Sequence, residues 1–168
     1  MRATTVLLTG MSGVGKSTAL VGLADCGWGT VDADEDGLVD EHADRTALRL
    51  AELRAVLGQA PAGRPFAVAA TGEGQGELYP LVDHVVLLTA PWPVLADRLV
   101  ARTVNDFGKG PGEADRVRAD QEAYEPLIRA GADLVLDTSA LTPDEVVGRI
   151  AALAPAAEPT RPSAGAAR

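Results

Sequence analysis

A glycine-rich loop between an apolar run and a helix-forming run constrains this chain more than any other feature. Residues 10–17 read G-M-S-G-V-G-K-S, which matches the spacing G-x-x-x-x-G-K-[ST] of a phosphate-binding (Walker A) loop. The run T-T-V-L-L-T-G at 4–10 predicts a buried strand before the loop, and S-T-A-L-V-G-L-A at 17–24 predicts a helix after it. Because both flanking elements are present, we favour a functional loop over a chance glycine turn between a strand and a helix.

The loop predicts a site for a nucleotide polyphosphate. Glycines let the backbone turn so that N–H groups face phosphate oxygens, and the following helix adds the positive end of its dipole. The Lys16 ammonium is expected to reach the β- and γ-phosphates, and the Ser17 hydroxyl is expected to coordinate Mg²⁺. A dinucleotide-binding fold is excluded because its glycine spacing differs and Lys16 would have no role. The loop residues expected to bind the nucleotide are Gly10, Ser12, Gly13, Val14, Gly15, Lys16, Ser17 and Thr18.

Composition and charge narrow the range of partners. The 168 residues carry a net charge of −9, which disfavours nucleic acid or an anionic membrane surface as the main partner. The single cysteine, Cys26, excludes an internal disulfide and is typical of a reducing compartment. The first apolar run is too short for a signal peptide, and no stretch is long enough to span a bilayer. We therefore expect a cytoplasmic protein, and a monomer because no apolar surface stripe is visible.

Strand-like runs alternate with helix-like runs, which predicts an α/β fold with a mainly parallel sheet. One domain is expected over residues 1–154, and the Pro/Ala-rich tail at 155–168 is expected to be disordered. Pro126 is expected to kink or divide the helix that contains it. Ligands of such sheets bind at the carboxyl ends of the strands. Strands are expected at 4–10, 28–34, 66–71, 83–90 and 132–139, and helices at 17–24, 45–58, 93–102, 113–131 and 142–153, the last with a capping box of Thr142 and Glu145.

Two carboxylates follow the second predicted strand. The stretch V-D-A-D-E-D at 31–36 places Asp32 and Asp34 two residues apart, so on an extended strand both side chains point to the same side. Facing the end of the phosphate loop, they could hold Mg²⁺ waters and accept a hydroxyl proton. The alternative is a solvated acidic turn, and Asp36 is expected to lie on the surface.

In its loop, its paired acids and its last strand, the chain resembles the small-molecule kinases of the P-loop class, the shikimate kinase and gluconate kinase group, with nucleoside monophosphate kinases as more distant relatives. The likeness covers roughly residues 4–153. It implies a P-loop NTPase three-layer sandwich, in which five parallel strands in the order 2-3-1-4-5 carry helices on both faces and a small lid. It also implies ATP and Mg²⁺ as cofactors. By this resemblance Asp32 assists the metal, and Asp34 binds the acceptor hydroxyl and takes its proton.

The loop after the third strand is a candidate for contact with the acceptor. It reads T-G-E-G-Q-G at 71–76, where the resembled group carries consecutive glycines. The predicted acceptor contacts here are Gly72, Glu73 and Gly74, with glycine N–H groups brought close to the ligand. An ordinary turn at the strand exit is the alternative. The charge of Glu73 disfavours an anionic acceptor and hints at a neutral or polyol substrate.

Basic residues around a predicted lid at about 103–115 are candidates for phosphate contacts. Arg98 and Arg102 lie one turn apart on a predicted helix and aim at the lid, so both are placed in the nucleotide site, with Arg102 as the catalytic contact and Lys109 as second choice. Alternatively, the two arginines pair with Asp97 or Asp106 on a solvated face. The resemblance also implies a substrate-holding arginine in the next helix, best matched by Arg118. The arginine that would face a substrate carboxylate is left open among Arg45, Arg49 and Arg54.

These residues favour transfer of the ATP γ-phosphoryl group to a hydroxyl of a small metabolite or natural product, by positioning and charge stabilisation. The expected catalytic set is Lys16, Asp34, Asp32 and Arg102, with Ser17 and Asp32 at the metal. A nucleotide (monophosphate) kinase is one alternative, and it would need more arginine around the acceptor. A non-transferring, nucleotide-binding regulatory protein is the other, although no guanine-reading N-K-x-D is present to indicate a GTPase.

Overall fold

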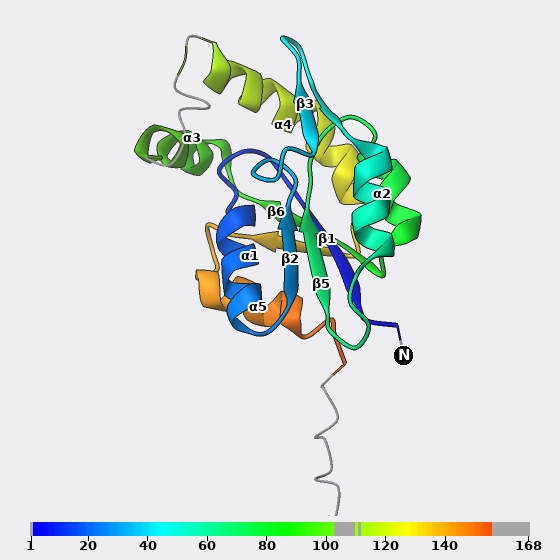
Figure 1. The fold of residues 1–168 in the computed structure, drawn as a ribbon. Helices are drawn as coiled ribbons and strands as arrows, with labels where there is room; N and C mark the ends of the chain where they lie inside the picture. Colours follow the sequence, from blue (N-terminus) through cyan, green and yellow to red (C-terminus); the bar gives the residue numbers. More distant parts are fainter. Residues whose placement is uncertain (1, 103–109, 111, 156–168) are drawn as a thin grey trace, which may run out of the picture.

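The computed structural model describes residues 2–102, 110 and 112–155. Five strands form one parallel sheet in the order β2-β5-β1-β6-β7. Counted along the chain, these sheet strands run 2-3-1-4-5, so the predicted fold class and strand order are confirmed (Figure 1). The strands are β1 (Thr5–Thr9), β2 (Gly29–Asp32), β5 (Phe66–Ala69), β6 (His84–Thr89) and β7 (Leu134–Asp137).

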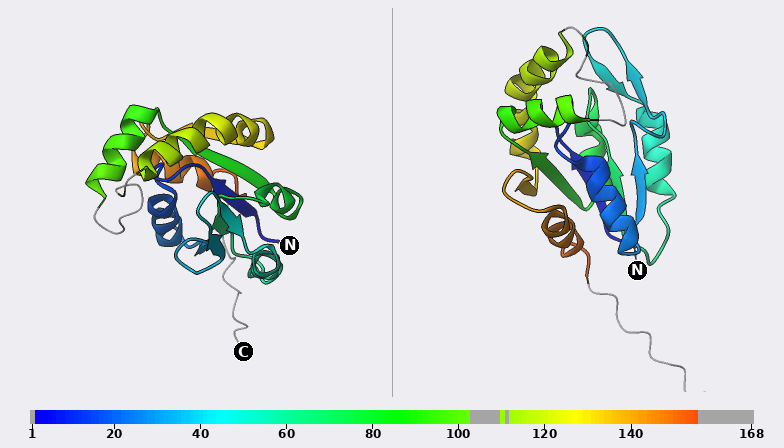
Figure 2. Two further views of the ribbon diagram at one scale, coloured as in Figure 1. Left: turned by 90° about the horizontal axis from the view of Figure 1, so that it is seen from above. Right: turned by 90° about the vertical axis from the view of Figure 1, so that its left-hand side faces the viewer.

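Helices cover both faces of the sheet, because successive residues of its central strand point to opposite faces. Val6 and Leu8 of β1 belong to a core that also contains residues of α1 (Lys16–Asp25) and α5 (Pro143–Ala151). Leu7 belongs to a second core with residues of α2 (Leu50–Gly58) and the 3-10 helix η1 (Gln75–Leu81). Figures 1 and 2 show α1 and α5 packed on one side of the sheet and α2 on the other. The remaining helices are α3 (Trp92–Ala101) and α4 (Glu113–Gly131).

The predicted helix at 45–58 is wrong in its first part. Its start forms a hairpin, in which β3 (Val39–Glu41) pairs antiparallel with β4 (Thr46–Leu48), and α2 begins only at Leu50. The outer edge of β4 also meets the loop after β5, where Glu73 N–H donates to Thr46 O (2.8 Å) and Leu48 N–H donates to Glu73 O (3.1 Å). These backbone bonds come from residues distant in the sequence, so tertiary pairing overrides local helix propensity here.

The sequence predicted an effect of Pro126 on its helix and a capping box at the start of the last helix. Pro126 lies inside α4, which runs undivided over 19 residues, so the expected division does not occur. Pro126 and Glu122, four residues earlier, are both exposed, so water can satisfy the carbonyl that proline leaves without a donor. The capping box of α5 is confirmed: Glu145 N–H donates to Thr142 Oγ1 (3.2 Å) and Thr142 N–H to Glu145 Oε2 (2.7 Å).

Several expectations fall on residues outside the described ranges. Residues 103–109 and 111, which make up most of the predicted lid and include Lys109, are among them, as is the tail from residue 156 onward. Within the described ranges, each helix is too short or too polar to cross a membrane.

Candidate functional site

The phosphate-binding loop joins β1 to α1 at the carboxyl end of the central strand. Gly10, Gly13 and Gly15 have φ angles of 145°, 87° and 99°, a region that glycine adopts without strain. A Cβ atom on Gly10 would lie 2.2 Å from the carbonyl oxygen of Leu88 in β6, so no other residue fits there. Val14 is fully buried and anchors the loop to the core. Because α1 begins at Lys16, its first N–H groups face the end of this loop.

Lys16 lies folded over its own loop. Its ammonium donates to the carbonyl oxygens of Gly10 (2.5 Å) and Met11 (3.3 Å). Burial lowers the pKa of Lys16, the negative charges of Asp34 and Asp32 oppose this shift, and the positive charge of Arg102 adds to it. Lys16 therefore lies within electrostatic reach of both predicted acids and of Arg102, as expected for a shared phosphate site.

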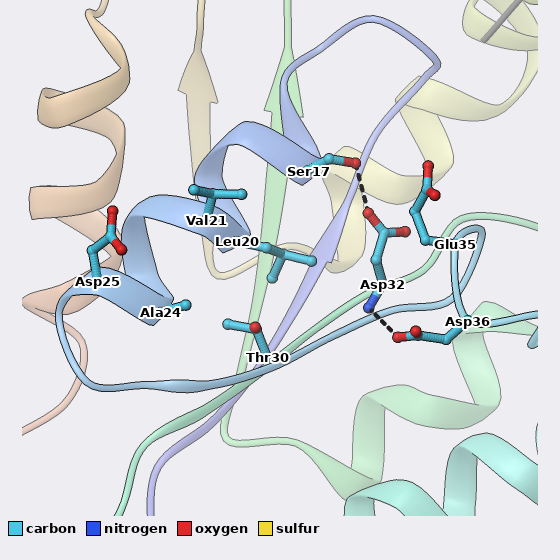
Figure 3. Close-up of a pocket in the computed structure, with 9 residues that line it drawn as sticks. All are labelled: Ser17, Leu20, Val21, Ala24, Asp25, Thr30, Asp32, Glu35 and Asp36. Atoms are coloured by element: carbon cyan, nitrogen blue, oxygen red, sulfur yellow. Dashed lines mark hydrogen bonds between the residues drawn. The ribbon is translucent and has the colours of Figure 1, made fainter. Parts of the chain in front are cut away.

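Asp32 ends β2 and faces the start of α1. The Ser17 hydroxyl donates to Asp32 Oδ2 at 2.6 Å (Figure 3), and Asp34 N–H donates to Oδ1 of the same carboxylate at 3.2 Å. A hydroxyl and a carboxylate side by side are the hard oxygen donors that Mg²⁺ prefers. In the described part of the chain, however, no cluster of three or more His, Cys, Asp or Glu side chains could hold a metal alone. The pair therefore fits a Mg²⁺ ion whose other ligands are phosphate oxygens and water, as is usual for this ion.

Asp34 lies in a turn rather than on a strand. The prediction that Asp32 and Asp34 share one side of an extended strand is wrong, because β2 ends at Asp32 and Asp36 N–H donates back to Asp32 O (2.8 Å). The pKa of Asp34 is nevertheless raised, first by lost hydration and then by the charges of Asp32, Glu41 and Glu35, while the charge of Lys16 lowers it. The turn thus brings Asp34 close enough to Lys16 for their charges to interact.

Beside this site a groove of about 370 Å³ runs between α1 and β2 (Figure 3). Leu20, Val21 and Ala24 form its apolar wall, and one end reaches the Ser17–Asp32 pair. Lys16 and Asp34 do not line it. The groove therefore lies next to the predicted metal position and apart from the predicted proton acceptor.

Arg98 fastens the phosphate loop to the end of β7. Its guanidinium donates to Gly13 O (3.2 Å), to Thr138 Oγ1 (2.8 Å) and to Thr138 O (2.8 Å), and Thr138 Oγ1 donates in turn to Val14 O (2.8 Å). These bonds to the loop and to Thr138 do not involve the acids that sequence reasoning offered as partners of Arg98. Arg98 therefore supports the nucleotide loop from behind, whereas the charge of Arg102 acts on Lys16.

We expect Arg98→Met to destabilise the protein by about 1–3 kcal/mol, because it leaves the half-buried carbonyls of Gly13 and Thr138 without a donor. Urea unfolding measures this change. Arg118→Met is the matched control: Arg118 forms an exposed i,i+4 pair with Glu122 (3.2 Å), which is worth roughly 0.3–0.5 kcal/mol. Equal losses in the two variants would contradict a supporting role for Arg98.

The loop after β5 is hydrogen-bonded to the hairpin and to its own residues. Gly72 N–H donates to Gln75 Oε1 (3.3 Å) and Glu73 N–H to Thr46 O, so both groups already have partners within the protein. A Cβ atom on Gly72 would lie 2.7 Å from Thr46 O, which explains the glycine by close backbone approach. The Glu73 carboxylate accepts from Arg45 Nε at 2.7 Å. Gly74 takes a left-handed conformation (φ 91°) at the start of η1.

The arginines left open by sequence reasoning form exposed ion pairs. Arg45 pairs with Glu73, Arg49 with Asp40 and Arg54 with Glu77. In α4 it is Arg116, two residues before the predicted Arg118, that reaches the hairpin, where its Nη1 donates to His42 O at 3.5 Å. Arg116 is also more buried than Arg118, with 24% against 57% of the side chain exposed.

Two threonines near the loop were missed by sequence reasoning. Thr138 holds Val14 and Arg98, as described above, and the Thr71 hydroxyl contacts both backbone polar groups of Gly10. Thr71 lies two residues after the end of β5, which is next to β1 in the sheet. Thr138 directly follows β7, which is next to β6. A residue with a hydroxyl group at the carboxyl end of a strand near the loop is the sequence feature that could have predicted both contacts.

Several solved structures with the same fold are named as small-molecule kinases. Shikimate kinase from Acinetobacter baumannii, in complex with shikimate, matches with a TM-score of 0.63 and 17% identity over 90% of this chain and 92% of that one. A gluconokinase from Sinorhizobium meliloti matches with a TM-score of 0.59 and 20% identity over 90% and 92%. A sugar kinase from Janibacter sp. matches with a TM-score of 0.59 and 20% identity over 89% and 93%. The chain has the P-loop kinase fold.

Curated proteins similar in sequence are named nucleotide-binding proteins. One from Gluconacetobacter diazotrophicus is 33% identical over 145 residues, which are 84% of this chain and 39% of that protein. One from Acidothermus cellulolyticus is 34% identical over 155 residues, which are 88% and 48%. The chain thus spans about half the length, or less, of these two relatives. No model of a known protein family matches the chain. The predicted resemblance to the kinase group is confirmed at the level of the fold.

Proposed function

We propose that this protein transfers the γ-phosphoryl group of Mg²⁺–ATP to a hydroxyl group of a small metabolite or natural product. The observation that carries the proposal is the position of Asp34, whose charge interacts with that of Lys16 at the end of the phosphate-binding loop. A carboxylate there can receive a proton from a hydroxyl that attacks a phosphoryl group held by Lys16. The P-loop kinase fold supports the same reaction class.

The phosphate-binding loop, Lys16 and Asp34 have separate roles in the transfer. Backbone N–H groups of the loop bind phosphate oxygens, and Lys16 neutralises the β- and γ-phosphates. The acceptor oxygen forms a bond to the γ-phosphorus while the bond to the bridging oxygen breaks and ADP leaves. The hydroxyl proton passes to Asp34 and then to solvent. Asp34 suits this role because its raised pKa makes it a stronger base than an ordinary aspartate.

The other polar groups stabilise charge and exclude water. A Mg²⁺ ion held by Ser17, with Asp32 binding its water ligands, would neutralise charge on the phosphates. Arg102 would stabilise the migrating phosphoryl group, since its charge already reaches the Lys16 ammonium. A positive charge there also offsets the repulsion between the phosphates and a chain of net charge −9.

A panel of hydroxylated compounds tests the proposal. Sugars, sugar acids, cyclitols, nucleosides and amino alcohols are incubated with ATP and Mg²⁺, and ADP release is compared with and without each compound. We expect at least one class to accelerate ADP release and to yield a phosphate ester detectable by mass spectrometry. ADP release that no compound accelerates, together with inorganic phosphate as product, would contradict transfer to a hydroxyl.

We expect Asp32→Asn to raise the Mg²⁺ concentration needed for half-maximal ATP binding by about 10–100-fold. The substitution removes the carboxylate charge that is expected to orient the water ligands of the ion. Calorimetric titration of ATP at several Mg²⁺ concentrations measures this shift. Asp25→Asn is the matched control, because Asp25 is an exposed acid on the wall of the same groove. An unchanged Mg²⁺ requirement in Asp32→Asn would place the metal elsewhere.

A second candidate is a nucleotide-binding protein that transfers no phosphoryl group. The observation in its favour is that the curated relatives are named only for nucleotide binding. Such a protein would bind ATP with the same loop residues but would show no dependence on an acceptor. The compound panel separates the two candidates, because only a transferase forms a phosphate ester.

A further inference from the structure

The groove between α1 and β2 carries charge of one sign. Among the described residues that line it, the charged ones are all acids: Asp25, Asp32, Glu35 and Asp36. Figure 3 shows Asp25 at one end of the groove and the other three acids gathered at the opposite end. A groove lined by negative charges concentrates cations from solution. The occupant that this groove favours is therefore positively charged.

Apolar side chains of α1 separate the two acidic ends. Leu20, Val21 and Ala24 form this apolar wall, and the side chain of Val21 is 65% exposed. Contact with an apolar group would remove this surface from water, which is worth about 25 cal/mol for each Å² buried. The groove therefore suits an occupant that has an apolar middle and basic ends.

The groove also borders a free edge of the sheet. β2 is an outer strand, so one of its edges has no neighbouring strand in the described sheet. The N–H groups of Gly29 and Ala33 donate to carbonyls on the β5 side, so those of Thr30 and Asp32 point to the outer edge. Asp36 Oδ2 accepts from Asp32 N–H at 3.1 Å. Thr30, which lines the groove, is thus the position where an added strand can form main-chain hydrogen bonds.

We propose that this groove and the outer edge of β2 form a docking surface for an extended, basic peptide segment of a protein partner. The segment lies alongside β2 and pairs its backbone with Thr30. Its apolar side chains contact Val21, and its Lys or Arg side chains meet Asp25 at one end and Glu35 and Asp36 at the other. A small organic cation would use the charges alone, whereas an extended chain uses the acids, the apolar wall and the strand edge together.

Selection of short peptides tests the surface. Random peptides of about seven residues, within the usual length of a strand, are displayed on phage and selected against the full chain. Enriched peptides are then synthesised, and their affinity is measured by fluorescence polarisation. We expect enrichment of Lys and Arg together with Val, Ile and Thr, the residue types that favour strands. Binding should weaken as salt is added, because the charges involved are exposed.

A substitution on α1 localises the binding. Val21→Lys removes the apolar contact and repels a basic peptide, so we expect at least about tenfold weaker binding. Val100→Lys is the matched control, because Val100 is 77% exposed on α3 and does not line the groove; its affinity should equal that of the wild type. If thermal melts show that Val21→Lys does not fold, Asp25→Asn takes its place and should also bind more weakly.

Methylation of the peptide backbone tests strand addition apart from charge. Since alternate N–H groups of an added strand face β2, methylating every second amide should abolish binding, and methylating the amides between them should not. Three results would overturn the proposal: no enriched peptide, enriched peptides that bind the folded groove variant as tightly as the wild type, or equal effects of methylation at all positions. The test needs neither ATP nor an acceptor, so its outcome is independent of the proposed phosphoryl transfer.

Discussion

Asp34→Asn is expected to lower acceptor phosphorylation by about 10²–10⁴-fold, the usual contribution of a positioned general base. The amide keeps the shape of the side chain but cannot take the hydroxyl proton. ATP binding should persist, because the loop and Lys16 are unchanged and a negative charge near the phosphates has been removed. Product formation under saturating ATP, with binding measured separately by calorimetry, separates these two effects.

The raised pKa of Asp34 gives this prediction a pH signature. In the wild type, kcat/KM should rise with pH as Asp34 loses its proton, at a pH above the ordinary aspartate value of 3.8. The folded state holds this proton more tightly than the unfolded state, so stability falls as pH rises from 3.8 through the folded-state pKa. Asp34→Asn should therefore be more stable than the wild type at neutral pH, and the difference should vanish at acidic pH.

Asp25→Asn is the charge-matched control for Asp34→Asn, because it removes an exposed acid that lies on α1 and outside the proposed reaction centre. It should retain activity. Full transfer activity in a folded Asp34→Asn protein would contradict the assignment of Asp34 as proton acceptor. An inactive Asp34→Asn protein that is also less stable at neutral pH would contradict the electrostatic account of the site.

Lys16→Met should lower phosphoryl transfer by about 10²–10³-fold or more, since it removes a preorganised positive charge from the migrating group. Unlike Asp34→Asn, it should also weaken ATP binding, because the ammonium is expected to contact the phosphates in the ground state. Parallel measurement of ATP affinity and of the single-turnover rate distinguishes the two variants.

The lowered pKa of Lys16 predicts the stability of the same variant. Burial disfavours the charged ammonium in the folded state, so the unfolded state binds the proton more tightly. Wild-type stability should therefore rise with pH between the folded-state pKa and the ordinary value of 10.5. Lys16→Met, without this charge, should be at least as stable as the wild type at neutral pH. Transfer at the wild-type rate would contradict the role of the loop lysine.

The nucleotide loop was predictable because residues close together in the sequence determine its geometry. Glycine spacing, a preceding apolar strand and a following helix lie within residues 4–24, and each was found where it was expected. The strand order was also predicted, although by resemblance rather than from the residues. The pairing of Ser17 with Asp32 likewise agrees with two residues placed together on sequence grounds.

The acceptor side was less predictable, because distant backbone pairing shapes it. The hairpin of β3 and β4 owes part of its hydrogen bonding to Glu73, which lies 25 residues beyond Leu48 in the chain. The turn after Asp32 broke the strand alternation on which the placement of Asp34 was argued. Thr71 and Thr138 donate hydrogen bonds to backbone carbonyls of the loop, and no sequence motif predicts such contacts. In each case the deciding contact joins segments that are far apart in the sequence.

A crystal structure with Mg²⁺ and a non-hydrolysable ATP analogue is the most direct measurement. We expect the Lys16 ammonium to contact the terminal phosphates, with the Asp34 carboxylate facing the γ-phosphate across a space that admits one hydroxyl group. A Lys16 ammonium without contact to the phosphates, or an Asp34 side chain turned away from the nucleotide into bulk solvent, would contradict phosphoryl transfer by this site.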